Sequence, residues 1–118
     1  MNKAGADSAL PFSKGPNSGD LISQTSMTYY HSYDSSHSDA GATSIDCSHI
    51  AIDIAGIANH NGNVIAYNAE GQQVGSVSMT GNGTFHIYAE KIRSWKLNYN
   101  FPQGYPGMSL SYTLSMYI

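Results

Sequence analysis

The stretch that decides the fold is residues 108–118, MSLSYTLSMYI, in which large apolar side chains alternate with small hydroxyl side chains. The apolar set is Met108, Leu110, Tyr112, Leu114, Met116 and Ile118, and the hydroxyl set is Ser109, Ser111, Thr113 and Ser115. A period of two residues is typical of a β-strand with one face in the core. No charged residue occurs between Asn98 and Ile118, although exposed edge strands usually carry lysine or proline. We therefore expect this strand to be central in a sheet, or paired with another subunit.

A second alternating run covers residues 45–54. Its isoleucines from Ile50 to Ile54 occupy even positions, whereas Ile45 and Cys47 occupy odd positions. A β-bulge adds one residue to a strand and exchanges its two faces. A bulge near Ser48 would therefore bring both sets of apolar residues to the same side of the sheet.

Turn-forming sequences recur after this run at the spacing expected of a sandwich or barrel. They are Asn61-Gly62, Glu70-Gly71, Gly81-Asn82-Gly83, Glu90-Lys91 and Pro102-Gln103-Gly104. Between them lie predicted strands over residues 63–68, 73–79, 84–89 and 93–101, and a short β-like run precedes them at residues 26–33. The serine-rich residues 34–44 are predicted to be a loop. The pattern predicts an all-β fold, an antiparallel β-sandwich of the jelly-roll or Ig-like type with about seven or eight strands.

The chain has room for one domain at 118 residues. Residues 1–25 are rich in Gly, Ser, Asn and Pro, and their large apolar side chains are Leu10, Phe12, Leu21 and Ile22. Such a segment buries little apolar surface when alone. We therefore predict an extended N-terminal arm over residues 1–25 and a single β-sandwich domain over residues 26–118.

Charged residues make up only 11% of the chain, and the formal net charge is −3, whereas typical domains are about 25% charged. Nucleic-acid binding needs several Lys or Arg contacts, so it is disfavoured. A single cysteine, Cys47, allows no intrachain disulfide. No apolar run approaches the ~18 residues that a membrane span requires. The opening residues 1–7 have no apolar region of the kind that a secretory leader contains, so we expect no leader. We expect synthesis in a cytoplasm, without a membrane partner.

The titratable side chains include two groups that could carry catalysis or bind a metal ion. Cys47, His49 and Asp53 share parity, but residues two apart on a strand point along a line, and a triad must converge on one point. We therefore expect no catalytic residue, no cofactor and no enzymatic activity. His31, Asp34, His37 and Asp39 form the densest group of potential ligands for zinc or a related ion, although their spacing matches no specific metal motif.

A resemblance to known modules is carried by Val64–Gly75, VIAYNAEGQQVG, which continues through Gly83-Thr84-Phe85 to Ile92-Arg93-Ser94-Trp95. This pattern resembles a hairpin and following strand of bacterial and phage β-sandwich modules of the carbohydrate-binding, Ig-like and jelly-roll types. The match covers about a third of the chain, and its residues are turn and core positions, so it implies fold. An uncharged β-domain with an N-terminal arm is also similar in character to small decoration, or cement, proteins of tailed-phage capsids.

The second resemblance implies a non-enzymatic structural protein of a virion, which would be found on the virion surface. Its partners would be the major capsid protein and copies of itself, with a trimer as one arrangement. The residues expected at its interfaces are Leu10, Phe12, Leu21, Ile22, Tyr105, Tyr112 and Tyr117. The alternative is a carbohydrate-binding or adhesin-like module that binds a glycan through Tyr105, Trp95 and neighbouring amide side chains.

Overall fold

The computed structural model describes residues 19–30, 36–56, 61–100 and 109–118, and these residues form strands joined by turns. The strands are β1 (Leu21–Tyr30), β2 (Ser36–Ala55), β3 (Asn61–Tyr67), β4 (Gln73–Met79), β5 (Gly83–Asn100) and β6 (Ser109–Tyr117). Every pairing is antiparallel, in the order β1-β6-β2-β5-β3-β4. In this part of the chain no helix is long and apolar enough to cross a membrane.

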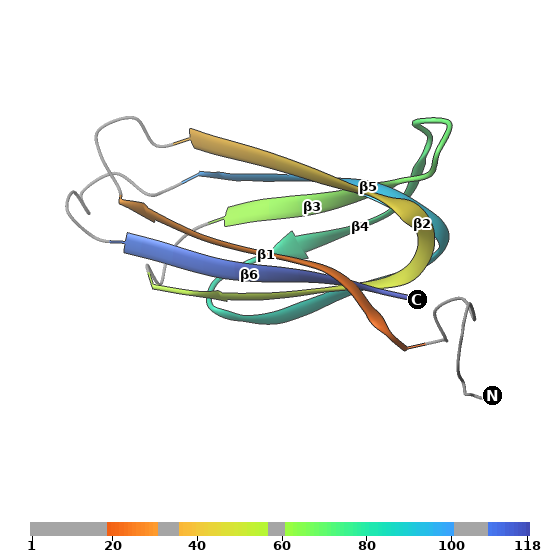
Figure 1. Cartoon of the computed structure of the whole chain (residues 1–118). Helices are drawn as coiled ribbons and strands as arrows, with labels where there is room; N and C mark the ends of the chain where they lie inside the picture. The colour runs from red at the N-terminus through yellow and green to blue at the C-terminus, as the bar shows by residue number, and fades with distance from the viewer. Residues whose placement is uncertain (1–18, 31–35, 57–60, 101–108) are drawn as a thin grey trace.

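The two longest strands belong to both layers of the sandwich. Residues 36–42 of β2 pair with residues 94–100 of β5, while residues 49–54 pair with residues 83–88. The first layer consists of β1, β6, the second half of β2 and the first half of β5. The second layer consists of the first half of β2, the second half of β5, β3 and β4. Figure 1 shows β2 curving from one layer into the other, so six strands give two layers of four segments each.

Both long strands turn a corner where they pass from one layer to the other, and their pairing is irregular there. The register of β2 against β5 shifts between Ala42 and Cys47 and again between Cys47 and His49. On β5, Lys91 has a φ of 59°, which is uncommon for a non-glycine residue. Bulges increase twist and bend a strand, so these irregularities carry each strand from one layer to the other. The predicted bulge near Ser48 is confirmed.

The hydrophobic core lies between the layers and uses the alternation seen in the sequence. Its buried members include Ile50, Ile52 and Ile54 of β2, Trp95, Leu97 and Tyr99 of β5, and Leu110, Tyr112, Leu114 and Met116 of β6. Strand β6 is central, between β1 and β2, so the uncharged last strand has strand partners on both sides within the chain. The prediction of an all-β antiparallel sandwich is confirmed.

Two segments that were predicted as a loop and a turn belong to strands in the structure. The serine-rich segment predicted as a loop is strand from Ser36 onward, because pairing with β5 gives its backbone partners that local propensity does not anticipate. Glu90-Lys91, predicted as a turn, lies inside the continuous strand β5. Residues 84–89 and 93–101 were therefore predicted as two strands where the structure has one bent strand that ends at Asn100.

Of the other predicted turns, some are confirmed, one is wrong and one cannot be compared with the structure. Glu70-Gly71 lies in the turn between β3 and β4, and Gly81 and Asn82 form the bend before β5. Asn61-Gly62 belongs to β3 instead, where Gly62 pairs with Met79 and Tyr99. Pro102-Gln103-Gly104 lies outside the described residues.

The N-terminal boundary differs from the predicted one. Strand β1 begins at Leu21, so residues 21–25, which were assigned to the arm, pair with the end of β6. The backbone N–H of Ile118 donates to the carbonyl of Asp20 at 3.0 Å, immediately before β1. Residues 1–18 lie outside the described part of the chain.

Candidate functional site

The outer surface of the first layer is lined mostly by short polar side chains, and we call it the hydroxyl face. Its members are Gln24, Ser26 and Thr28 of β1, Ser111, Thr113 and Ser115 of β6, Ala51 and Asp53 of β2, and Thr84 of β5. The strand register places these residues in rows across the sheet, such as Thr84, Asp53, Thr113 and Ser26. Asp53 is the only ionised group among these members.

Neighbouring side chains on the hydroxyl face are joined by hydrogen bonds across the strands. Gln24 donates to Ser115 at 3.0 Å, Ser26 and Thr113 share a hydrogen bond of 2.9 Å, and Thr28 and Ser111 share one of 3.0 Å. Thr84 donates to the Asp53 carboxyl group. These bonds hold the side chains in place before any partner binds, so binding immobilises few additional rotamers.

One end of this face carries a row of stacked rings, which we call the ring row. His49 lies between Tyr88 and Tyr117, with ring centroids 4.4 Å and 5.2 Å away and interplanar angles of 10° and 25°. His86 lies next in line on β5, and its Nδ1 is 2.9 Å from His49 Nε2. Tyr88 is the most exposed large hydrophobic residue of the described chain, at 72%. The row therefore combines fixed rings with accessible polar edges.

The electrostatics of the ring row favour a neutral His49. Partial burial lowers the pKa of His49 below its ordinary value, and repulsion from His86 lowers it further. A neutral imidazole beside a second imidazole can share one proton with it, or it can offer its lone pair to a metal ion.

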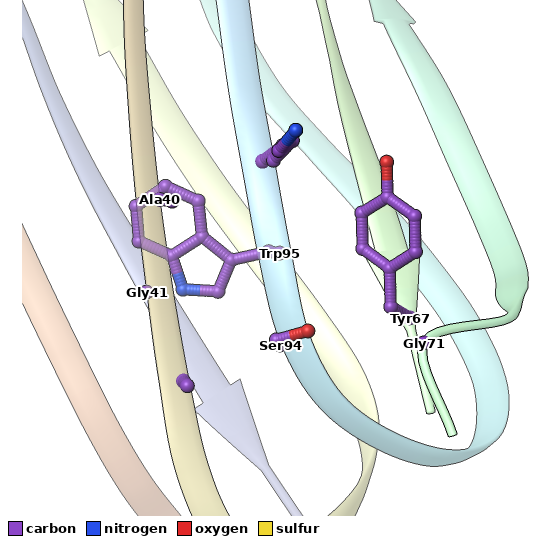
Figure 2. Close-up of a pocket in the computed structure, with 8 residues that line it drawn as sticks. Ala40, Gly41, Tyr67, Gly71, Ser94 and Trp95 are labelled. Carbon is purple, nitrogen blue, oxygen red and sulfur yellow. The ribbon is translucent and has the colours of Figure 1, made fainter. Parts of the chain in front are cut away.

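A groove lies on the second layer, where β5 passes between β2 and β3. Its volume is about 520 Å³, and its lining includes Ala40, Ala42, Tyr67, Ser94 and Lys96. Figure 2 shows Tyr67 on β3 on one side of β5, and Trp95 reaching from β5 toward Ala40 and Gly41 on the other. The hollow forms because the side chains of Ala40 and Ala42 on β2 are much shorter than that of Tyr67, which lies on the other side of β5.

The floor of this groove depends on a glycine. A Cβ at Gly41 would lie 2.6 Å from the Trp95 indole, which is too close for any real contact. Trp95 is only 1% exposed, so its ring supports the groove and offers no open face on which a sugar could stack. The sequence-based suggestion that Trp95 binds a glycan directly is therefore wrong. Tyr105, the other suggested sugar contact, lies outside the described residues.

A third polar group joins the two layers inside the sandwich. Tyr29 of β1 and Tyr112 of β6 both donate their hydroxyls to Oδ2 of Asp39 on β2. The Tyr29 ring also lies against His37, with centroids 4.7 Å apart. Desolvation, reinforced by the Asp39 carboxyl group, raises the pKa of Tyr29 to about 12 and raises that of Tyr112 further. We call this group the Asp39 clamp.

The predicted metal ligands divide between this clamp and segments outside the described structure. His37 and Asp39 lie on β2 in contact with tyrosines, whereas His31 and Asp34 lie outside the described residues. In the part of the chain that the structure describes, no group of three or more His, Cys, Asp or Glu side chains could hold a metal ion.

The three residues of the catalytic pattern point to different sides of the sheet. Cys47 is 1% exposed and faces the core, and burial raises the pKa of its thiol. The register shift between Cys47 and His49 exchanges the faces, so His49 and Asp53 lie on the outer surface. The parity shared in the sequence does not place these side chains together.

The predicted interface residues have separate environments. Leu21 is 50% exposed at the start of β1, and Ile22 packs against the core. Tyr112 is 2% exposed, so its ring belongs to the core and is not available to another subunit. Tyr117 lies in the ring row, while Leu10 and Phe12 lie outside the described residues.

Sequence reasoning did not identify His86 or Tyr88 as site residues. Their parity on residues 84–89 places them opposite Phe85 and Ile87 and therefore on the outer surface. Their cross-strand partnership with His49 depends on a bulged register, which no local pattern specifies.

Comparisons with known proteins inform the fold alone. No family model matches the chain, and no curated protein matches it. The periplasmic inhibitor of g-type lysozyme from Aeromonas hydrophila is similar in structure, with a TM-score of 0.52 at 10% identity over 90% of this chain and 91% of that one. The Yersinia pseudotuberculosis-derived mitogen gives 0.51 at 8% identity over 81% and 86%. The SPBc2 prophage-derived protein YomS gives 0.48 at 11% identity over 80% and 93%.

Proposed function

We propose that this chain is a non-enzymatic structural protein of a virion, a decoration or cement protein that binds the outer shell through its hydroxyl face. The observation that carries the proposal is the set of cross-strand hydrogen bonds on that face. A sheet surface of short, mutually bonded side chains can contact a broad protein surface without ordering long charged side chains.

The size of the face indicates how it would bind. Four strands about 4.8 Å apart and about six residues along each strand cover roughly 400 Å². A stable interface buries about 800 Å² on each partner, so one face would bind a shell weakly. Several linked copies would bind far more tightly through avidity, which supports a homo-oligomer such as a trimer as the binding form.

The test compares two serine-to-lysine variants. Ser26 and Ser76 are both exposed, on the edge strands β1 and β4 and therefore in different layers. Virions prepared from cells that carry the gene should contain the protein by mass spectrometry. Ser26→Lys should lower its binding to stripped particles by about tenfold or more, because it places an unpaired charge in the contact.

The control, Ser76→Lys, should bind as the unchanged protein does. Circular dichroism and light scattering should show both variants folded, with the same assembly state. Absence of the protein from purified particles, or equal loss of binding in both variants, would contradict the proposal.

A second candidate function, glycan binding, is favoured by the groove beside Tyr67. Its volume of about 520 Å³ lies within the range of ligand pockets, about 300–1,000 Å³. Tyr67 can pack against a sugar ring, and Ser94 and Lys96 can bond its hydroxyls. The suggested occupant is a neutral or acidic saccharide.

A sugar titration distinguishes the two candidates. Trp95 lies at the groove floor, so its fluorescence should change on saturable binding. Tyr67→Ala should abolish that change, and Tyr88→Ala, on the opposite layer, should leave it intact. A glycan array without any binder would remove this candidate and leave the first unaffected.

A further inference from the structure

We propose that His49 and His86 form a chelating site for a divalent transition metal ion, of the kind that prefers square-planar or tetragonal nitrogen coordination, such as Cu²⁺ or Ni²⁺. The site lies on the outer surface of the first layer and does not depend on which partner that surface binds.

The distance between the two imidazoles is the first observation. His49 Nε2 and His86 Nδ1 are 2.9 Å apart. Two nitrogens bound at about 2.0–2.1 Å from one ion, with an angle of about 90° between them, are about 2.9 Å apart. The two nitrogens now point at each other, so each ring must turn by about 45° to direct its lone pair at one ion in place of the proton that they share. A tetrahedral ion would need a wider separation of about 3.3 Å.

The second observation is that His49 is held in place. It is stacked between Tyr88 at 4.4 Å and Tyr117 at 5.2 Å, on neighbouring strands whose register fixes all three rings. A ligand that is already oriented loses little freedom when a metal binds. His86 is opposite Ala51, whose methyl group leaves space above the sheet beside the pair.

The charge of the surroundings also suits a cation. The titratable groups that face the pair are Tyr88 on β5 and Tyr117 on β6, and Asp53 lies on the same side of β2. No lysine or arginine belongs to this group in the described structure. The remaining coordination positions face outward and would hold water or a ligand atom from a docked partner.

The experiment titrates the whole chain, at pH 7.5 and without a tag, with Cu²⁺, Ni²⁺ and Zn²⁺ by calorimetry and records the electron paramagnetic resonance spectrum of the Cu²⁺ form. The expected result is one ion per chain, tighter for Cu²⁺ than for Ni²⁺ and weaker for Zn²⁺ than for Cu²⁺, with splitting from two nitrogens. His49→Gln and His86→Gln should each weaken binding by about tenfold or more, because the chelate becomes a single ligand.

The controls are His60→Gln, which matches the substitution, and Ser76→Lys, on the outer surface of the other layer; both should leave the affinity within about twofold. Melting curves without metal establish that each variant is folded. The proposal is overturned if the controls weaken binding as much as the His86 variant does, if the spectrum shows one nitrogen or none, or if neither ion binds at micromolar concentrations.

Discussion

The two layers of this sandwich share β2 and β5, yet their outer surfaces differ. On the first layer, short hydroxyl side chains bond to one another and a row of rings closes one end. On the second layer, the exposed Asn98 accepts a hydrogen bond from Ser38 at 2.7 Å, and small residues beside Tyr67 leave a groove. The difference arises at the corner, because the bulge after Cys47 exchanges the faces of β2. One strand thus supplies alanines and a glycine to the groove and a histidine to the opposite layer.

The largest expected difference is between a central strand of the first layer and an edge strand of the second. Leu114 is 1% exposed on the central strand β6, so Leu114→Ala should lower the free energy of unfolding by about 2–5 kcal/mol. Val77 on the edge strand β4 is only partly buried, and Val77→Ala should cost about 1 kcal/mol. Urea denaturation measures both values. Equal costs would show that the edge strand β4 packs against the core as tightly as the central strand β6.

The Asp39 clamp provides the next contrast, because it ties the layers together from inside. Asp39→Ala leaves two part-buried tyrosine hydroxyls without their acceptor and should cost about 1–3 kcal/mol. Asp53 accepts a hydroxyl hydrogen bond at an exposed position, where water can replace it, so Asp53→Ala should cost less than about 0.5 kcal/mol. The same denaturation measurement checks this pair, and a larger loss in the Asp53 variant would refute the contrast.

The clamp also predicts sensitivity to alkali. Burial and Asp39 raise the pKa of Tyr29 from 10.0 to about 12, so folding favours the protonated phenol. The stability contributed by Tyr29 is therefore complete below pH 10 and is lost as the pH rises from about 10 through about 12. Thermal melts between pH 9 and pH 12 should show a falling midpoint, and Tyr29→Phe should make that fall shallower. An unchanged slope would indicate that other groups control the transition.

The smallest expected effect concerns the ring row in acid. The pKa of His49 is lowered from 6.5, so folding favours the neutral imidazole. Its contribution to stability is present above pH 6.5 and is lost as the pH falls below that value. Melts between pH 7.5 and pH 5 should show a modest decline that His49→Gln removes. Nuclear magnetic resonance titration of both imidazoles checks the assignment, and an ordinary pKa at His49 would contradict it.

Much of the fold could be read from local patterns. The alternation at residues 110–116 predicted a central strand, residues 73–79 were predicted as a strand with the bounds of β4, and the parity change near Ser48 predicted the bulge. The predictions failed where pairing partners are distant in sequence. Neither the strand at residues 36–42 nor the passage of β5 through Lys91 has a local signal, because both depend on β2 and β5 bending together.

The candidate sites show the same division. Cys47, His49 and Asp53 share parity in the sequence, but the bulge directs Cys47 into the core and His49 to the surface. The pairing of His49 with His86 and Tyr88 spans more than 35 residues of sequence, and its register is set by the corner. The groove exists because alanines of β2 come to lie beside Tyr67 of β3 across β5.

The sequence alone determined which side chains face the core, because a strand has a period of two and apolar side chains leave water. It also determined the sparse charge of the surface. Only the tertiary structure decided which outward side chains are neighbours, since cross-strand contacts follow from register and from the bend of the long strands. The opening strand pattern at residues 108–118 thus specified a buried face and a hydroxyl face, and the fold joined that hydroxyl face to the histidines of β2 and β5.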